Sequence, residues 1–285
     1  MSHFDKLTPT HNLFTTLRSD NPQWWQLLKS QPDCYIDIRK DNTINVYYNG
    51  GSLFKISYRR GYGYNVKIHP AYLGQKGNKY VPFPNYASLD QPKLKEIKDN
   101  IASRFGHKSE SGLKAQMMCA TGSIYIDTEF AFTEPDENNP KKSKIIRIDL
   151  VRLNGKTIEF VELKRISDGR LLKKESYGAS KGDEEILEQV KKYNKFLNDN
   201  KDEIIKYYKN LLKIKSDLDL LPASLKGRTF DKDTCLDLLD KVVLFIAKEN
   251  YEDRVTEKRK ERRKVMRNLL KSHNVSVETD FTGGL

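Results

Sequence analysis

Residues 145–166 read IIRIDLVRLNGKTIEFVELKRI, and they carry the clearest structural signal in the chain. Two apolar runs flank Asn154-Gly155, the strongest short signal for a β-hairpin, because both residues tolerate the positive φ that a type I′ turn requires. With these two residues as the loop, Asp149 lies opposite Phe160. The sequence therefore predicts two antiparallel strands in that register.

Charged side chains are expected to converge on one face of this hairpin. Strand side chains alternate and directly opposite residues share a face, so Glu162 and Lys164 fall on the side of Asp149, with Arg147 opposite Glu162. Glu162 is then a diagonal neighbour of Asp149, at ~7–8 Å between backbones, close enough for both carboxylates to touch one ion. The alternative is an ordinary solvent-facing hairpin with surface ion pairs.

The chemistry of these side chains points to a divalent cation and phosphate. Charges inside strands this apolar are costly unless something neutralises them. Carboxylate oxygens suit Mg²⁺, which usually takes one or two carboxylates and keeps waters for a substrate phosphate. Lys164 adds a cation that can position an attacking water or neutralise developing charge.

A second motif lies on the helix predicted at about residues 184–215. Gln189 and Tyr193 are four residues apart, so they share one helical face, one turn apart. Their alternative role is packing on a half-buried helix face.

The order of these motifs resembles the PD-(D/E)xK nuclease superfamily: Asp149, then Glu162-Leu163-Lys164 after an Asn-Gly hairpin, then Gln189 and Tyr193 on the next helix. The Gln-xxx-Tyr element looks like that of its recombination-repair exonuclease branch. The resemblance covers about residues 92–277, including the order helix, three strands, helix, strand. Ile148 stands where the name-giving proline would be, a change that many members tolerate.

The resemblance implies a restriction-endonuclease-like core. It makes Asp149 and Glu162 metal ligands and Lys164 the catalytic lysine, with Gln189 and Tyr193 beside the metal site as catalytic residues. The implied cofactor is Mg²⁺, with Mn²⁺ as the alternative.

A further acidic ligand in such nucleases often comes from the first helix or strand. The chain offers Glu110 and Glu129 for this role. Glu129 is the better metal ligand, since alternation sets it against the face of Ile126, Thr128 and Phe130. For either residue the alternative is a surface carboxylate or a charge at a helix terminus.

Composition along the chain predicts two parts. A β-rich stretch is followed by the loop-favouring residues 82–92, so we expect an antiparallel N-terminal module at 1–85 and a nuclease-like domain at 92–285. The strands predicted for the module are Cys34–Arg39, Ile44–Tyr48, Leu53–Tyr58 and Tyr64–Tyr72.

The second part is expected to be an α/β domain with a central mixed sheet flanked by helices on both faces. The continuous apolar run Val242–Ala247 predicts a doubly covered central strand. The other elements expected there are a helix at about 93–118, a basic helix at 252–271 and a short strand at 275–278.

Composition excludes several classes of protein. The chain has 285 residues, 37% of them hydrophobic, which is enough for a core and excludes wholesale disorder. No apolar run approaches the ~20 residues that a spanning helix needs, and residues 1–10 are polar, unlike the apolar stretch of a signal peptide. We therefore expect a cytoplasmic protein without membrane association. The three cysteines, Cys34, Cys119 and Cys235, are expected to be buried thiols in a reducing compartment.

The formal net charge of +12 makes a nucleic-acid partner plausible. Three segments are candidates for contacts with nucleic acid. For each of them the alternative is an ordinary solvated or packed surface without a binding role. The residues in the loop after the hairpin are Arg165, Arg170, Lys173, Lys174, Tyr177 and Lys181. Those in the N-terminal module are Tyr47, Tyr48, Phe54, Tyr58, Arg59, Arg60, Tyr62, Tyr64 and Lys67. Those in the basic helix are Arg254, Lys258, Arg259, Lys260, Arg262, Arg263, Lys264, Arg267 and Lys271.

The expected function is a Mg²⁺-dependent nuclease that hydrolyses phosphodiester bonds, with DNA as the expected substrate. One alternative is a non-catalytic nucleic-acid-binding protein on a degenerate nuclease fold. Another is a structural interaction protein in which the hairpin charges are surface ion pairs. RNA as substrate, endo or exo action, sequence specificity, oligomeric state and a role in restriction, defence or repair stay open.

Overall fold

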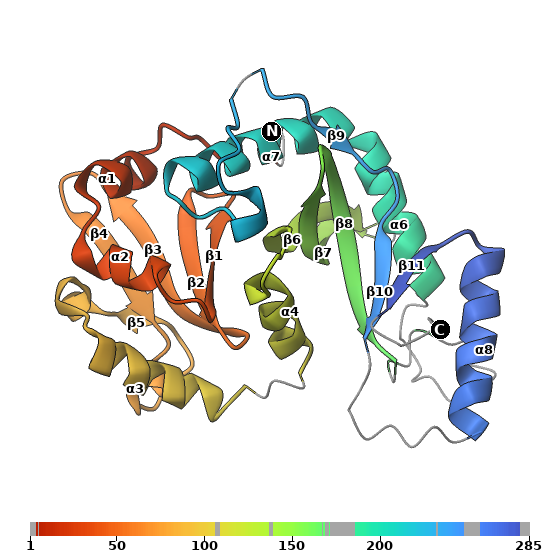
Figure 1. The fold of residues 1–285 in the computed structure, drawn as a ribbon, viewed down its shortest axis with the longest axis horizontal. Coiled ribbons are helices and arrows are strands. Elements are labelled where there is room, and N and C mark those ends of the chain that lie inside the picture. The colour runs from red at the N-terminus through yellow and green to blue at the C-terminus, as the bar shows by residue number, and fades with distance from the viewer. Residues whose placement is uncertain are drawn as a thin grey trace. The chain divides into compact units, whose positions relative to one another are not determined.

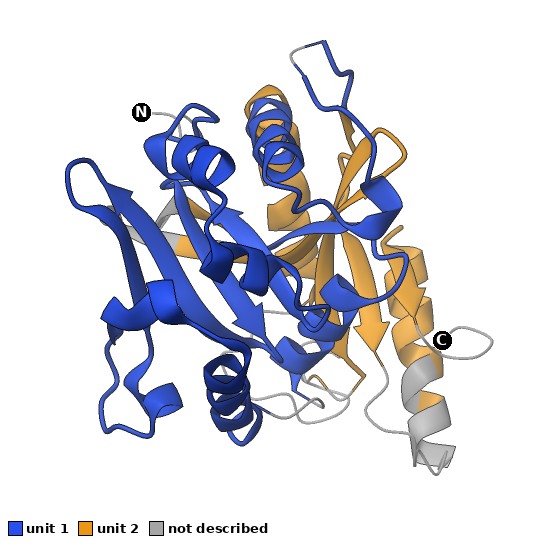
Figure 2. Ribbon diagram, turned by 60° about the vertical axis from the view of Figure 1, so that its left-hand side comes forward, with its two compact units in different colours: residues 1–128, 205–236 blue, residues 129–204, 237–285 orange. Residues whose placement is uncertain are grey.

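The computed structural model divides the chain into two compact units, each assembled from segments far apart in the sequence. Residues 1–128 and 205–236 form the first unit, and residues 129–204 and 237–285 form the second (Figures 1 and 2). The predicted boundary at residues 82–92 lies inside the first unit. The structure describes residues 4, 6–105, 109–136, 139–166, 168, 171, 186–231, 233–247 and 257–279.

The first unit contains an antiparallel sheet with strand order β1-β2-β3-β4-β5. The strands are β1 (Cys34–Arg39), β2 (Thr43–Tyr48), β3 (Gly51–Arg59), β4 (Gly63–Ile68) and β5 (Val81–Pro82). The predicted antiparallel sheet is thereby confirmed, within a unit that extends beyond the predicted bounds of 1–85. The fourth strand ends at Ile68 rather than Tyr72, because Pro70 begins the 3₁₀ helix η1 (Pro70–Leu73), where its fixed φ and missing N–H are tolerated.

Helices surround this sheet in the first unit. They are α1 (Asn12–Asp20), α2 (Gln23–Lys29), η2 (Pro84–Ser88), α3 (Gln91–Ala102), α4 (Glu110–Cys119), most of α7 (Lys201–Asp217) and η4 (Ala223–Leu225). The helix predicted at 93–118 is thus two helices. Ser109 begins the second one as an N-cap, its hydroxyl accepting from the backbone N–H of Gly112 at 3.0 Å. Because α3 contacts β3 and η1, it belongs to the first unit.

The second unit contains a mixed sheet, with described strands in the order β11-β10-β8-β7-β6 and β9 paired to β8. The strands are β6 (Tyr125–Asp136), β7 (Asn139–Asn154), β8 (Thr157–Arg165), β9 (Asp237–Leu238), β10 (Val243–Ala247) and β11 (Ser276–Thr279). β7 and β8 are antiparallel, whereas β10 runs parallel to both β8 and β11. The apolar run at 242–247 is therefore an interior strand, as predicted.

The hairpin register differs from the predicted one by two residues. Asn154 pairs with Thr157 and Val151 with Phe160, so the loop is Gly155-Lys156. Gly155 has φ 60° while Asn154 stays in the strand, which is the pattern of a hairpin turn with glycine at its first central position. An even shift leaves every side chain on its predicted face.

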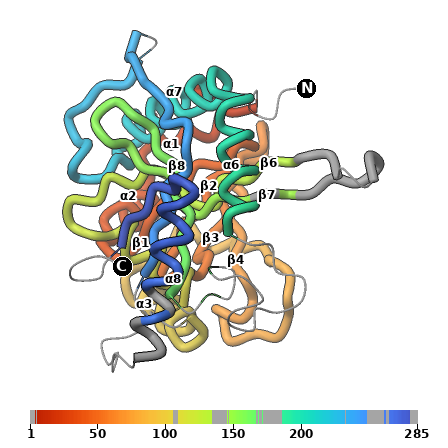
Figure 3. Tube along the Cα trace, turned by 90° about the vertical axis from the view of Figure 1, so that its right-hand side faces the viewer, coloured from red at the N-terminus to blue at the C-terminus, as the bar shows by residue number. Residues whose placement is uncertain are grey.

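Two helices of the second unit cover the same face of the mixed sheet, α6 (Ile186–Asp199) and α8 (Glu257–Ser272). In Figure 3 both lie on the near side of the strands. The predicted mixed sheet flanked by helices is therefore confirmed, although α6 and α8 lie on one face rather than on both. The single helix predicted at 184–215 is α6 followed by α7, separated at Asn200, whose carbonyl accepts from Ile204 N at 3.0 Å.

Aromatic packing seats α6 on the sheet. The Phe196 ring stacks on Phe132 with centroids 3.4 Å apart, and Phe130 packs edge-on against Phe160 on β8 at 5.0 Å. Because Phe160 is two residues from Glu162, this packing holds α6 over the face that carries Glu162.

The cysteines Cys34, Cys119 and Cys235 all lie in the described part of the chain and are free thiols, as predicted. The expectation that they are buried is wrong, because Cys34 and Cys119 are half-buried and Cys235 is exposed. No described helix combines the length and the apolar character needed to cross a membrane.

Candidate active site

The centre of the predicted site is on β8. Glu162 and Lys164 are two residues apart, so they share a face of the sheet. Both residues are buried, with 2% and 1% of their surface exposed, and Lys164 Nζ contacts Glu162 Oε1 directly. The two predicted residues therefore form a buried ion pair in an interior strand.

Asp149 joins this site from β7. Its carboxylate oxygen Oδ2 accepts a hydrogen bond from the backbone N–H of Leu163 at 3.0 Å. The paired residues of β7 and β8 begin at Leu150 and Val161, so the side chain of Asp149 accepts where a backbone carbonyl would accept in a regular ladder. This bond holds the Asp149 carboxylate beside the strand that carries Glu162.

The helix motif reaches the same place. Gln189 Nε2 donates to Glu162 Oε1 at 2.9 Å and to the Tyr193 hydroxyl at 2.6 Å. The Tyr193 hydroxyl in turn donates to the carbonyl of Arg147 at 2.7 Å. The predicted neighbourhood of Gln189, Tyr193 and Glu162 is thus present, and α6 is tied to both strands. The Arg147 side chain, expected opposite Glu162, is exposed, and its carbonyl makes the contact instead.

The Gln189 amide uses its nitrogen in this network, and its oxygen has no described partner. The carbonyl oxygen Oε1 of Gln189 is buried and has no hydrogen-bond partner among the described residues. A buried acceptor without a partner costs ~1–3 kcal/mol. A water or substrate group that donates a hydrogen bond would therefore be stabilised at this point.

The donor set suits a hard cation coordinated by few protein ligands. Within the described residues, no group of three or more His, Cys, Asp or Glu side chains lies close enough together to hold a metal ion. Asp149 and Glu162 supply two carboxylates from adjacent strands, which fits Mg²⁺ because that ion commonly takes one or two carboxylates and completes its shell with water.

Glu129, the predicted further ligand, occupies an unusual backbone position in β6. Its φ is +52°, in the left-handed region, and its side chain is half-buried. This conformation breaks the period-two alternation on which its predicted face rested. Since Glu129 forms no described group of three with Asp149 and Glu162, its role as a ligand stays a prediction.

Glu110 lies in the first unit, at the first position of α4. Its Oε1 is 3.8 Å from Lys114 Nζ, one turn further along the helix. A carboxylate in the first turn is favourable to the helix dipole, so this position has a structural explanation.

Sequence reasoning missed a second buried charged cluster, which lies in the first unit and comprises Asp37, Arg39, Asp127 and Lys215. Arg39 lies 3.1 Å from Asp37 and 3.6 Å from Asp127, and Lys215 Nζ lies 3.7 Å from Asp37. Tyr208 donates to Asp127 at 3.1 Å. When all four groups are ionised, the two acids and two bases therefore balance in charge.

Burial governs the ionisation of this cluster. Loss of solvent, reinforced by the nearby Asp37 charge, raises the pKa of Asp127 to about 7. Loss of solvent also lowers the pKa of Lys215. A sequence signal existed, because each acid interrupts an apolar strand, in Ile36-Asp37-Ile38 and Ile126-Asp127.

The aromatic residues of the first sheet divide into two groups. Tyr64 packs edge-on against Trp24 at 5.4 Å and against Tyr58 at 5.4 Å, which is core packing. Tyr62, by contrast, is 77% exposed and lies under the Arg59 guanidinium at 4.4 Å. Packing thus explains Tyr58 and Tyr64, while Tyr62 stays available to a partner.

The other predicted contact segments are partly described. In the loop after the hairpin, only Arg165 of the proposed contacts is described. The proposed loop contacts outside the described residues are Arg170, Lys173, Lys174, Tyr177 and Lys181. In the basic helix, Arg254 lies outside them, as do the side chains of residues 258–260, 262 and 263, whereas Lys264, Arg267 and Lys271 are described and exposed.

No protein-family model, curated protein or solved structure matches this chain.

Proposed function

We propose that the chain is a metal-dependent nuclease with a restriction-endonuclease-like core in its second unit. The observation that carries the proposal is the convergence on Glu162. Asp149 from β7, Lys164 from β8 and Gln189 from α6 meet beside one buried carboxylate. The order β6, β7, β8, α6, β10, α8, β11 supports the same core.

Each side chain has a role in phosphodiester hydrolysis. Asp149 and Glu162 would hold the cation, which when bound supplies positive charge at the phosphate and acidifies water. Lys164 neutralises negative charge that develops on the phosphate, and Gln189 orients Glu162 through its 2.9 Å hydrogen bond. Tyr193 positions Gln189 and anchors the helix on Arg147.

DNA is the substrate we propose, because a chain with a formal charge of +12 favours a polyanion. A second candidate is a binding protein on a degenerate nuclease fold. The direct contact of Lys164 with Glu162 favours it, since an ammonium committed to a carboxylate is not aimed at a phosphate.

Cleavage assays separate the two candidates. Circular and linear DNA and a matched RNA are incubated with protein in Mg²⁺, in Mn²⁺ or with a chelator. A nuclease cleaves only with the metal, and Glu162→Gln abolishes cleavage. Glu188→Gln is the matched control, because Glu188 is an exposed carboxylate on α6 paired with Lys191 at 2.9 Å. Metal-independent binding without cleavage would establish the second candidate instead.

A further inference from the structure

The C-terminal end of α8 turns back sharply onto the mixed sheet. Asn274 adopts the left-handed conformation with φ 52°, which asparagine tolerates better than most residues. Val275 N donates to Leu270 O at 3.1 Å and closes the turn. β11 therefore runs back directly beside the last turns of α8.

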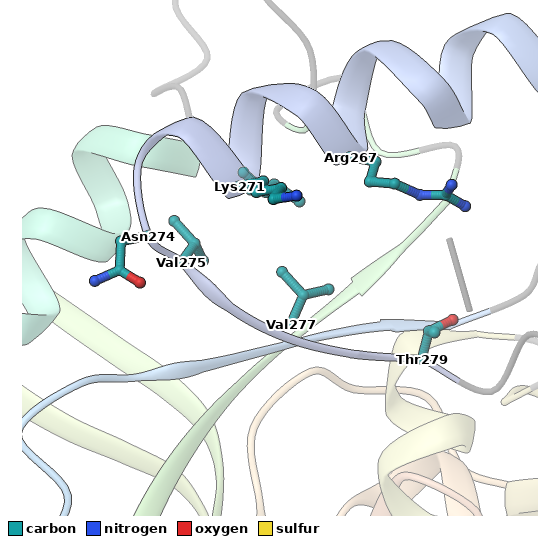
Figure 4. Close-up of a pocket in the computed structure, with 7 residues that line it drawn as sticks. Arg267, Lys271, Asn274, Val275, Val277 and Thr279 are labelled. Carbon is teal, nitrogen blue, oxygen red and sulfur yellow. The ribbon is translucent and has the colours of Figure 1, made fainter. Parts of the chain in front are cut away.

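A pocket of about 360 Å³ lies between α8 and β11 (Figure 4). Its lining residues are Arg267, Leu270, Lys271, Asn274, Val275, Val277 and Thr279. Leucine and valine side chains provide an apolar surface, and two cationic side chains stand at the helix. This volume falls in the range of small-molecule sites, ~300–1,000 Å³.

The cationic side chains lie on one edge of α8. Arg267 and Lys271 are four residues apart, and Lys264 precedes Arg267 by three, so all three share a helix face. Each is exposed, and none makes an ion pair within the described part of the chain. Repulsion between like charges at this spacing is relieved by a bound anion.

Sheet register connects the pocket to the candidate active site. Val277 pairs with Leu244, and Leu244 pairs with Glu162, so all three side chains share one face of the sheet. In the next row, Thr279 pairs with Ile246, which pairs with Lys164. Two strand spacings of ~4.8 Å place the pocket residues about 10 Å from the proposed catalytic residues.

We propose that this α8–β11 pocket binds the nucleic-acid strand next to the cleaved phosphodiester, a proposal that rests on the nuclease function above. Arg267 and Lys271 contact backbone phosphates, and Leu270 and Val277 contact an adjacent sugar or base. A separation of about 10 Å corresponds to roughly three steps of 3.4 Å along a strand. One bound strand would thus span both the pocket and Glu162.

The pocket's chemistry selects this ligand. A phosphodiester chain offers repeated negative charges beside apolar rings, which matches a row of cations beside valine and leucine. The shared face with Glu162 and Lys164 favours the substrate strand over a lipid surface or an acidic peptide. Binding to anionic vesicles, with no binding to nucleic acid, would therefore overturn the proposal.

The test uses the full chain and measures binding apart from cleavage. Arg267→Gln with Lys271→Gln is made in an Asp149→Asn background, and the anisotropy of labelled single-stranded and duplex DNA is followed over a salt series. At 0.15 M salt we expect about tenfold weaker binding. The slope of log affinity against log salt should fall by about 1.4–1.8, at ~0.7–0.9 per phosphate contact.

A matched control removes the same charge elsewhere in the second unit. Lys191→Gln with Lys195→Gln, on α6, removes two exposed lysines and should leave the salt slope unchanged. Equal effects of both pairs would show non-specific attraction and overturn the pocket. An unchanged affinity in the α8 variant would do the same.

A cleavage assay with the chain that retains Asp149 distinguishes failure of the pocket proposal from failure of the proposed nuclease function. Cleavage that persists while the α8 variant binds normally rejects the pocket and retains the nuclease. Pocket-dependent binding without any cleavage rejects the nuclease and retains the pocket as a nucleic-acid site. Absence of binding to both DNA forms and to RNA rejects the pocket.

Discussion

Two regions of this molecule bury acids beside a lysine, and they differ in what surrounds the charges. In the first unit, Asp37 and Asp127 face Arg39 and Lys215, drawn from β1, β6 and α7. In the second unit, the acids and Lys164 come from one hairpin, and an uncharged glutamine from α6 completes the contacts.

The difference separates a structural cluster from a candidate active site. The first-unit cluster joins three elements through opposite charges, so substitution of its residues should lower the free energy of unfolding. The Glu162 site has its acids on strands already held by ladder and aromatic packing, and Gln189 leaves a buried acceptor over. Substitution of the residues at the Glu162 site should therefore reduce the proposed activity rather than stability.

The largest stability effect is expected for Lys215→Met. At pH 8, above the pKa of Asp127, loss of this ammonium leaves Asp37 and Asp127 with one remaining cation, and an unbalanced buried acid costs about 3–5 kcal/mol. Urea unfolding measures the loss. Lys213→Met on the same helix removes an exposed lysine paired with Asp217 and should cost under about 1 kcal/mol. Equal losses of stability in the two variants would contradict a stabilising role for the Lys215 charge.

Asp149→Asn should have the opposite effect, a large loss of activity with little loss of stability. We expect cleavage to fall by about 10³-fold, roughly 4 kcal/mol of transition-state stabilisation, because the carboxylate is lost at the metal. The amide oxygen can still accept from Leu163 N, so the free energy of unfolding should change by no more than about 1 kcal/mol. Cleavage at the wild-type rate would contradict the site.

The first-unit cluster should make stability depend on pH. Asp127 has an ordinary pKa of 3.8 and a folded pKa of about 7, so between these values the folded state holds a proton that the unfolded state has released. Its contribution to the free energy of unfolding therefore falls as pH rises from about 4 to 7, by about 2 kcal/mol between pH 5 and 7.

Asp127→Asn removes this titration while retaining an acceptor for Tyr208. The difference in unfolding free energy between wild type and variant, measured at pH 5, 6, 7 and 8, isolates the effect from other groups. A difference that is constant across this range would mean that Asp127 is ionised throughout.

The smallest expected effect is that of Tyr193→Phe. The change removes the hydroxyl that links Gln189 to the Arg147 carbonyl, at 2.6 and 2.7 Å, while keeping the buried ring. Cleavage should slow about tenfold, the equivalent of one or two weakened hydrogen bonds, with metal affinity unchanged. A loss as large as that of Asp149→Asn would give Tyr193 a direct role in the chemistry.

Two Asn-Gly pairs show how much of a hairpin turn can be predicted from local sequence. Asn49 and Gly50 both have positive φ, 47° and 83°, and form the loop between β2 and β3. Asn154-Gly155 has the same composition, yet Asn154 remains in its strand and the loop moves on by one residue. The local preference allows both turns. Packing of Phe160 against Phe130 in the sheet accompanies the second choice.

Local sequence patterns were sufficient to predict the strands, the hairpin and the shared face of Asp149, Glu162 and Lys164. These follow from apolar runs and from a period of two, which an even shift in register leaves unchanged. The four-residue spacing of Gln189 and Tyr193 likewise places them on one helix face without tertiary information.

The remaining features could not be predicted from local sequence, because they depend on contacts between residues far apart in the chain. The break at Asn200, the assignment of α7 largely to the first unit and the meeting of Asp37 with Lys215 carry no local signature. The left-handed backbone conformation of Glu129 is also unpredictable from local sequence. The backbone preference of a glutamate disfavours it, so only contacts with surrounding residues can stabilise it. Local periodicity assigns faces, whereas long-range packing decides which faces meet.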